Sequence, residues 1–346
     1  MKIIRPVTVT PAMLTSSVPE TAPAAYAGGT AYALGDRASV VTGSAAAVYE
    51  SLAAANVGND PVSSPAWWRE VATTWLAWNG GTTYAEGDRV LDAANHREYV
   101  SLQGANTNHP VTDAAWWYPF PSNRWAMFDQ ANGTETMARD SISVSMALAG
   151  RIDSIALLNV SGASVRIEVA ADGAGTIYDQ TIGLSSFSGI TDWFAYFFEE
   201  VIREHNAIRL DLPLYASPTV TVTLSDPGSE VSIGNLVLGM ARELGAAQYG
   251  AQIGITDFSK KAADDFGNYT IVERPFSRRG RFTVWASGMQ IPALLDLIVK
   301  YRATPVVWIG AEERTETALF GFYKDFNVEI AYPTMSICTL EIEGLT

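Results

Sequence analysis

The feature that most constrains the fold is an internal repeat near the N-terminus. The pattern Gly-Gly-Thr-x-Tyr-x-x-Gly-Asp-Arg occurs at 28–37 and again at 80–89, an offset of 52 residues. The similarity continues in the Tyr-x-Ser-Leu segments 49–52 and 99–102, offset by 50, and in the Trp doublets 67–68 and 116–117, offset by 49. Three deletions in loops of the second copy restore the register, so we expect two small modules with the same fold.

Each copy has about 45 residues, too few for a large core, so aromatic side chains must supply most of the packing. The Gly-Asp-Arg segments are typical of a turn followed by a strand, since Gly and Asp tolerate the backbone of a tight turn. Successive side chains of a strand face opposite sides. We therefore expect one Trp of each doublet to be buried and the other exposed.

The second copy resembles the chitin-binding type-3 family of carbohydrate-binding modules. The residues that carry the resemblance are Trp78, Tyr84, Gly87, Asp88, Val90, Tyr99, Pro110, Trp116 and Trp117. In the first copy, Tyr26 stands where Trp78 does and Ala38 where Val90 does. The resemblance implies glycan binding, for which the candidates are Trp78, Tyr99, Trp116 and Trp117, and in the first copy Tyr26, Tyr49, Trp67 and Trp68. The alternative is that these aromatics form a core and that the modules are spacers or protein-docking units.

Composition excludes several classes of function. The 346 residues favour two to four domains, and a net charge of -14 has the wrong sign for binding nucleic acid or an anionic membrane. No stretch approaches the roughly 18 apolar residues of a membrane span, so we expect no membrane insertion. The first residues do not resemble a secretory signal, so we expect no export. Only 17% of residues are charged, a hint that other subunits cover part of the surface.

The pattern of short strands predicts a mainly β, multi-domain chain. An extended N-terminal arm is expected at 1–25, since the prolines of 6–25 exclude a long helix or a central strand. The repeat modules follow at 26–76 and 77–120, and short strands punctuated by Gly, Asp and Pro predict a β-sandwich at 121–240. The segment 193–198 is ambiguous between strand and helix, and its apolar density predicts burial.

The last part of the chain, 241–346, is expected to be a β domain with one packed helix. Pro292 suits a first helical turn, and an apolar stripe follows at helical spacing: Ile291, Leu294, Leu295, Ile298 and Tyr301. Strands are expected at 305–309, 318–330 and 334–343. Cys338, the single cysteine, lies in the last of these, and we expect a buried structural thiol.

The sequence predicts no enzyme, no cofactor and no metal site. Its three histidines are scattered and no catalytic motif occurs. The neighbouring carboxylates Glu199 with Glu200 and Asp264 with Asp265 would point to opposite faces of a strand. Asp257, Asp264, Asp265 and Asn268 offer oxygen ligands for calcium, but a turn is the simpler interpretation because the twelve-residue calcium loop is not matched.

Over almost its whole length the chain also resembles phage and prophage minor tail proteins described as carbohydrate-binding. The segments that carry this resemblance are 4–10, 123–129, 157–163, 193–198, 249–259, 302–310 and 342–346. It implies a structural component of a bacteriophage tail, in the minor tail or the distal tail and baseplate. In this interpretation, 241–346 is the tail-assembly domain. The expected partners are other tail proteins, further copies of the chain and a host cell-surface glycan, and the expected location is the virion tail, assembled in the host cytoplasm. The alternative is a dedicated host-surface adhesin whose repeats bind polysaccharide. A secreted polysaccharide hydrolase would need an acid/base pair and an export signal, neither of which we find.

Overall fold

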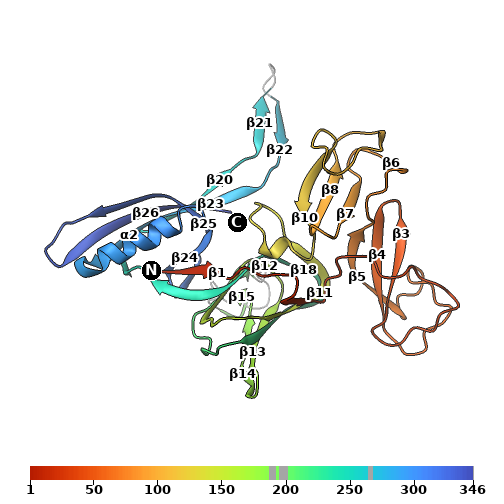
Figure 1. Ribbon diagram of the computed structural model, residues 1–346, viewed down its shortest axis with the longest axis horizontal. Coiled ribbons are helices and arrows are strands. Elements are labelled where there is room, and N and C mark those ends of the chain that lie inside the picture. The colour runs from red at the N-terminus through yellow and green to blue at the C-terminus, as the bar shows by residue number, and fades with distance from the viewer. Residues whose placement is uncertain (187–191, 195–201, 264–267, 346) are drawn as a thin grey trace.

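The computed structural model describes residues 1–186, 192–194, 202–263 and 268–345. The expectation of a mainly β, multi-domain chain with one packed C-terminal helix is confirmed. Figure 1 shows a central β body with the two repeat modules on one side and the helix-covered sheet on the other, while one hairpin projects away from the body. Among the described residues, no helix is long and apolar enough to cross a membrane.

The two modules have the same strand arrangement. Each contains a three-stranded antiparallel sheet whose middle strand is the second in sequence. The strands are β3 (Arg37–Thr42), β4 (Ala45–Ser51) and β5 (Trp68–Trp75) in the first module, and β7 (Arg89–Asp92), β8 (Arg97–Ser101) and β10 (Trp117–Pro121) in the second. The second also has the short pair β6 (Thr83–Tyr84) and β9 (Asn106–Thr107), which corresponds to the single bridge between Tyr32 and Asn56 in the first. The prediction that the two copies fold alike is confirmed.

The turn expected at each Gly-Asp pair is present. Gly35 and Gly87 have φ values of 84° and 87°, a backbone region that residues with a Cβ rarely adopt. The following Asp36 and Asp88 each accept a hydrogen bond from the backbone amide three residues earlier, at 2.7 and 2.8 Å. The repeated Gly-Asp therefore encodes a turn at the same point of each module.

The sandwich is built around one long strand. β18 (Pro218–Glu243) pairs in its first part with both β11 and β13, and in its second part with β12 and then with the N-terminal strand. Its core is aliphatic, with buried Ile, Leu and Val from β11, β12, β13 and β18. The remaining strands of this region and its short helix are β11 (Thr136–Ala147), β12 (Ser154–Ser161), β13 (Ser164–Ala171), β14 (Gly175–Gly183), β15 (Ser185–Ser186), β16 (Ile202–Arg203), β17 (Asn206–Arg209) and η1 (Ala126–Phe128).

The N-terminal segment is extended, as expected, but it is not a free arm. β1 (Lys2–Pro6) lies in the middle of the large sheet, between β18 and β24 (Val306–Ala311). Ile3 and Ile4 are fully buried and point into two different cores. Beyond it, β2 (Leu14–Ser16) adds to β11. Strand β1 thus joins sandwich and C-terminal region into one sheet, and the boundary expected at 240/241 falls inside β18.

The C-terminal region is a curved antiparallel sheet covered by α2 (Ile291–Lys300), whose first turn holds Pro292 as expected. Leu294, Ile298 and Tyr301 are buried against the sheet, but Leu295 is 43% exposed. The prediction of Leu295 as a core residue is wrong, because the sheet covers the side of the helix that carries Leu297 instead. The other elements are β19 (Ala246–Ala247), β20 (Gln252–Asp257), β21 (Lys260–Ala263), β22 (Tyr269–Val272), β23 (Phe276–Ser287), η2 (Gly288–Gln290), β25 (Arg314–Glu329) and β26 (Met335–Gly344).

Two further expectations concern single segments. Cys338 on β26 is buried, as predicted, and its burial raises the pKa of the thiol. The prediction that 193–198 is buried is wrong for Trp193 and Phe194, which are 77% and 70% exposed. Residues 195–198 lie outside the described part of the chain.

Candidate functional site

The centre of each module is a Tyr packed on a Trp. The rings of Tyr32 and Trp68 lie 4.9 Å apart and those of Tyr84 and Trp117 lie 5.2 Å apart, both pairs edge to face. All four side chains are buried, and only 2% of Trp68 and 1% of Trp117 are exposed. The second Trp of each doublet is therefore a core residue. This corrects the assignment of Trp68 and Trp117 as glycan-binding candidates, because neither presents a face to a ligand.

A repeated set of hydrogen bonds fixes this core. In each module the Tyr hydroxyl accepts a backbone N–H from five residues earlier, the buried Trp Nε1 donates to a loop carbonyl, and an Asn amide donates to a Ser hydroxyl. The pairs are Ala27 with Tyr32, Trp68 with Asn59, and Asn56 with Ser51 in the first copy, and Asn79 with Tyr84, Trp117 with His109, and Asn106 with Ser101 in the second. All six distances lie between 2.8 and 3.1 Å. These bonds satisfy the polar atoms that a core made of Tyr and Trp brings inside.

The first Trp of each doublet is more accessible, as expected. Trp67 is 37% exposed. Trp116 is half-buried and stacks on His109, with ring centroids 3.8 Å apart and an interplanar angle of 12°. One face of Trp116 is therefore already covered by an imidazole, which leaves less of it for a ligand than Trp67 offers.

In the first module, two half-buried tyrosines lie at the edge of the core. Tyr26 stacks on Tyr32 at 5.8 Å, and Tyr49 lies on the middle strand β4, opposite Ala38 and Glu70. Loss of hydration raises the pKa of both hydroxyls, and the negative charge of Asp60 adds to the effect on both. Both tyrosines therefore keep a protonated hydroxyl that can donate a hydrogen bond, beside an apolar ring of the kind that suits a sugar.

The second module places Trp78 and Tyr99 at the matching positions. Both are half-buried and pack against the core of Tyr84, Val90 and Trp117. Trp78 lies beneath Gly80, where a Cβ would come within 3.1 Å of the indole ring. The buried Nε1 of Trp78 has no hydrogen-bond partner among the described residues. We call Tyr26 with Tyr49, and Trp78 with Tyr99, the aromatic pairs, and they are the candidate binding residues that the geometry retains together with Trp67 and Trp116.

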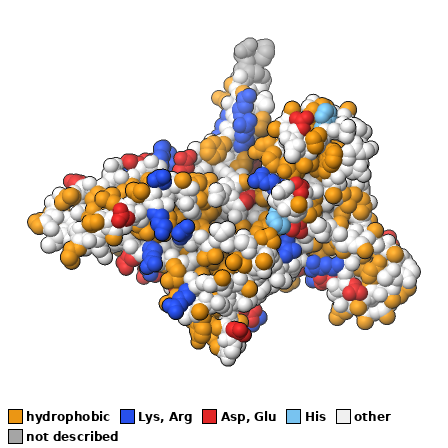
Figure 2. All heavy atoms as spheres, viewed as in Figure 1, with side chains coloured by type: hydrophobic (Ala, Val, Ile, Leu, Met, Phe, Trp, Pro, Cys, Tyr) orange, Lys and Arg blue, Asp and Glu red, His pale blue; other side chains and the backbone are white. Residues whose placement is uncertain are grey.

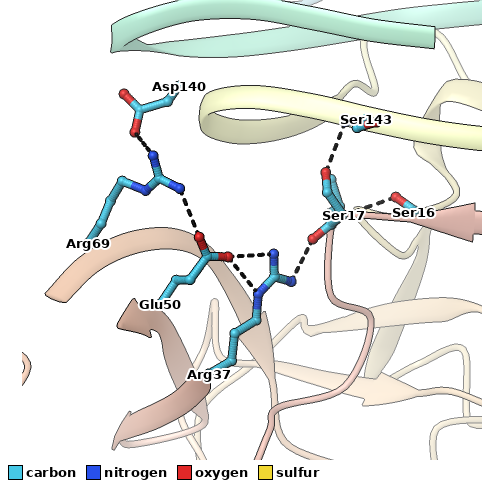
Figure 3. A network of polar contacts seen from close by, with 8 residues as sticks. Ser16, Ser17, Arg37, Glu50, Arg69, Asp140 and Ser143 are labelled. Atoms are coloured by element: carbon cyan, nitrogen blue, oxygen red, sulfur yellow. Dashed lines mark hydrogen bonds and ion pairs between the residues drawn. The ribbon is translucent and has the colours of Figure 1, made fainter. Parts of the chain in front are cut away.

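A network of charges holds the first module on the body (Figure 3). Glu50 accepts from Arg37 through Oε2, at 3.0 and 3.1 Å, and from Arg69 through Oε1, at 2.9 Å. Arg37 also donates to the carbonyl of Ser17 at 2.7 Å, and Arg69 Nη1 lies 3.3 Å from Asp140 Oδ2 on the sandwich. The module is thereby fixed to both the N-terminal segment and β11.

Glu20, in the N-terminal segment, connects to both modules. Its backbone carbonyl accepts the hydroxyl of Thr74 from β5 at 2.5 Å. Its carboxylate Oε1 lies 2.8 Å from Nδ1 of His96 and accepts the hydroxyl of Ser122 at 2.9 Å. The segment expected as an extended arm therefore lies across both modules and is bonded to each of them.

The modules also contact each other directly. The amide of Leu91 donates to the carbonyl of Leu76 at 2.8 Å, so the end of the first module runs beside β7. The guanidinium of Arg89 lies 5.5 Å from the ring of Trp75 and 5.7 Å from that of Phe120. These contacts fix the position and orientation of the two aromatic pairs relative to each other.

A cavity of about 630 Å³ lies between the second module and the body, and its lining includes 5–9, 95–97, Trp125 and 127–131. It contains Asp129, whose burial raises the pKa of the carboxyl to about 6 although Thr134 donates to it at 2.9 Å. In the described part of the chain, no group of three or more His, Cys, Asp or Glu side chains could hold a metal ion. Among the residues considered for calcium, Asp257 forms an ion pair with Lys261, whose Nζ lies 3.0 Å from the Asp257 Oδ2. Asp264 and Asp265 lie outside the described residues. So do the neighbouring carboxylates Glu199 and Glu200.

The sequence analysis did not identify the residues that dock the modules. A signal was present in the comparison of the two copies. Glu50 and Arg69 of the first correspond to Val100 and Tyr118 of the second, at the offsets of 50 and 49 that relate the surrounding segments. A charged residue that is absent from the otherwise similar copy marks a contact made by one module alone.

No family model, no curated protein and no solved structure matches this chain.

Proposed function

We propose that this protein is a structural, non-enzymatic component of a bacteriophage tail whose tandem modules bind a glycan of the host surface. The observation that carries the proposal is the pair of equivalent modules, each with half-buried aromatics at its edge, fixed on one continuous β body. Hydrogen bonds and ion pairs from Glu20, Glu50 and Arg69 make this attachment rigid. The sequence resemblances to phage tail proteins and to chitin-binding modules supply the context.

A neutral sugar fits the aromatic pairs. Half-buried Tyr and Trp rings offer an apolar face for stacking, and their supported positions mean that little side-chain entropy is lost on binding. The chain carries a net charge of -14, which disfavours an anionic glycan at short range. Two sites in a fixed relation would also strengthen binding to a polymer, since the second contact forms at high effective concentration.

Glycan binding is tested with the whole chain on an array of neutral cell-surface oligosaccharides that includes oligomers of N-acetylglucosamine. The double variant Tyr49→Ala/Tyr99→Ala removes one member of each aromatic pair and is expected to abolish binding. Tyr118→Ala is the matched control, because Tyr118 is 53% exposed and lies outside the core cluster of the second module. Absence of binding by the unmodified chain would favour modules that act as spacers or docking units.

The tail role is tested separately, by mass spectrometry of purified particles and by labelling the chain in electron micrographs of virions. The chain is expected in the particle, at the tail. Glycan binding by a chain that is absent from particles would favour the dedicated adhesin instead.

A further inference from the structure

We propose that His109 is a gate on the second module: its imidazole covers the face of Trp116 on which a sugar ring stacks, and the ligand displaces it towards Asn106. The rings of His109 and Trp116 are nearly parallel, with centroids 3.8 Å apart and an interplanar angle of 12°. Trp116 also packs against the module core that contains Trp117. The imidazole therefore occupies the place where an aromatic platform of this kind holds a ligand ring.

The first module differs from the second at this position. Asn59 corresponds to His109, because the backbone carbonyl of each accepts the indole N–H of the buried Trp, at 2.8 and 2.9 Å. The side chain of Asn59 donates to Oδ1 of the buried Asn56 at 2.8 Å. Trp67, which corresponds to Trp116, is 37% exposed. The same backbone position thus carries an inward side chain in one copy and an outward one in the other.

The outward imidazole leaves a buried acceptor without a donor. Asn106 corresponds to Asn56 and is 1% exposed, yet its Oδ1 has no hydrogen-bond partner among the described residues. The orientation of this amide is fixed, because its Nδ2 donates to the hydroxyl of Ser101 and that hydroxyl donates to the carbonyl of Gln103, both at 2.9 Å. A buried acceptor without a donor is unfavourable. An inward imidazole, whose ring N–H reaches this oxygen as Asn59 reaches Asn56, removes that cost.

Two conformations of His109 therefore compete. In the outward one the ring stacks on Trp116, and its Nδ1 lies 3.6 Å from Oδ2 of Asp113, too far for a hydrogen bond. In the inward one the ring loses this stacking and supplies the donor that Asn106 lacks. A stacked pair of rings and a single hydrogen bond are of similar strength. A ligand ring that replaces the imidazole on Trp116 therefore shifts the population to the inward conformation.

The ligand that fits this gate is a neutral saccharide. It must present a flat apolar face to the indole in place of the imidazole, as a sugar ring does. An anionic group would meet the carboxylate of Asp113 beside His109. Figure 2 shows that most of the surface of the second module on this face is hydrophobic or uncharged. The identity of the ligand rests on the proposed glycan binding, whereas the two conformations of His109 do not, so the two parts can fail separately.

The conformational part is tested without ligand, by hydrogen exchange of the whole chain. His109→Asn and His109→Ala both remove the stacked ring, but only Asn can donate to Oδ1 of Asn106, as Asn59 donates to Asn56. We expect exchange in β8 and β10 to be about fivefold slower in His109→Asn than in His109→Ala, the effect of one hydrogen bond. Exchange in β3 and β4 of the first module is the internal control and should be the same in both. Equal exchange in β8 and β10 would overturn the inward conformation.

The displacement is tested by nuclear magnetic resonance of the histidine rings. The chain has three histidines, so the spectrum of His109→Asn identifies the signals of His109. Stacking on an indole moves the ring C–H signals upfield, and Trp116→Ala should remove this shift. Titration with the trimer of N-acetylglucosamine is expected to move the His109 signals to their positions in Trp116→Ala, while those of His96 and His205 stay in place. Saturable binding that leaves the His109 signals upfield would overturn the gate.

The affinity of the second module gives the last test. In a Tyr49→Ala background, which removes one member of the aromatic pair of the first module, His109→Asn is expected to bind the trimer about fivefold more tightly, because no ring has to leave Trp116. Calorimetric titration measures the difference, and an unchanged or lower affinity would contradict the gate. A chain that binds no neutral saccharide would overturn both the ligand and the proposed glycan binding, and the exchange experiment would still decide whether His109 has an inward conformation.

Discussion

Arg69 Nη1 lies 3.3 Å from Asp140 Oδ2, and this ion pair joins the first module to the sandwich. Asp140 interrupts the pairing of β11 with β18 and has a φ of 63°, a left-handed conformation that Asp tolerates better than most residues. Its other carboxylate oxygen accepts the amide of Gly228 at 2.7 Å. The irregularity in β11 thus directs the Asp140 carboxylate away from the pairing with β18 and towards Arg69 of the first module.

We expect Glu50→Gln to loosen the first module. The change keeps the shape of the side chain but removes the charge between Arg37 and Arg69, so two guanidinium groups face each other without a carboxylate. The expected loss is about 1–2 kcal/mol, because the two arginine side chains, 31% and 40% exposed, are left partly desolvated beside each other. Hydrogen exchange should rise along β4, β5 and the adjoining part of β11. Glu168→Gln, which breaks a more exposed pair with Arg166, is the control and should cost under about 1 kcal/mol. Unchanged exchange in the Glu50 variant would show that the network does not fix the module.

The two Trp residues of each doublet are expected to respond in opposite ways to truncation. Trp68→Ala and Trp117→Ala each remove the centre of a small core and should destabilise the module by about 3–5 kcal/mol. Trp67→Ala removes a side chain that is 37% exposed, so its effect on thermal unfolding should be small. Comparable destabilisation by Trp67→Ala and Trp68→Ala would contradict the assignment of one Trp to the core and one to the surface.

The module fold could be predicted because its determinants are local and occur twice. Gly35 and Gly87 specify the same turn, and the alternation within each doublet assigns one Trp to each side of a strand. The resemblance to a known family then suggested which aromatics to consider. The resemblance could not show that Trp68 is a core residue and that Tyr49 is only partly buried. That distinction depends on the loop that packs over Trp68, where the carbonyl of Asn59 accepts a hydrogen bond from the indole.

Long-range pairing explains what the sequence did not reveal. Ile3 and Ile4 form a short apolar run with no local mark of a central strand, and their partners lie more than 230 residues away, around Ala241 and Trp308. Likewise, the contacts of Glu20 with His96 and Ser122 join residues 76 and 102 positions apart. Local patterns predict elements but do not specify such registers.

Asp129 should make stability depend on pH. Burial raises its pKa from 3.8 to about 6 in the folded chain, so ionisation is less favourable there than in the unfolded chain. Its contribution to stability is therefore fully present below about pH 4 and is lost as pH rises through 6. Partial exposure limits the effect to about 1–2 kcal/mol.

Urea unfolding of the unmodified chain and of Asp129→Asn, measured from pH 4 to 7.5, tests this. The stability difference between the two should change in favour of the variant as pH rises, since Asn cannot ionise. Asp172→Asn, at an exposed position, should show no such trend. A difference that is constant across the range would contradict the raised pKa.

If the modules bind glycan, the second should bind more tightly than the first, because Trp78 offers a larger stacking face than Tyr26, which occupies the matching position. More aromatic area gives more dispersion and releases more water on stacking. In the whole chain, we expect Trp78→Ala to weaken binding to neutral oligosaccharides more than Tyr26→Ala does, by about 1 kcal/mol or roughly fivefold. Calorimetric titration gives both affinities. Trp78→Tyr provides the matched comparison, since it makes this position of the second module the same as in the first and should bring the two sites closer in affinity. Stronger dependence on Tyr26 than on Trp78 would reverse the ranking, and would place the main contact on the first module, where loss of hydration and the charge of Asp60 raise the pKa of Tyr26 and Tyr49.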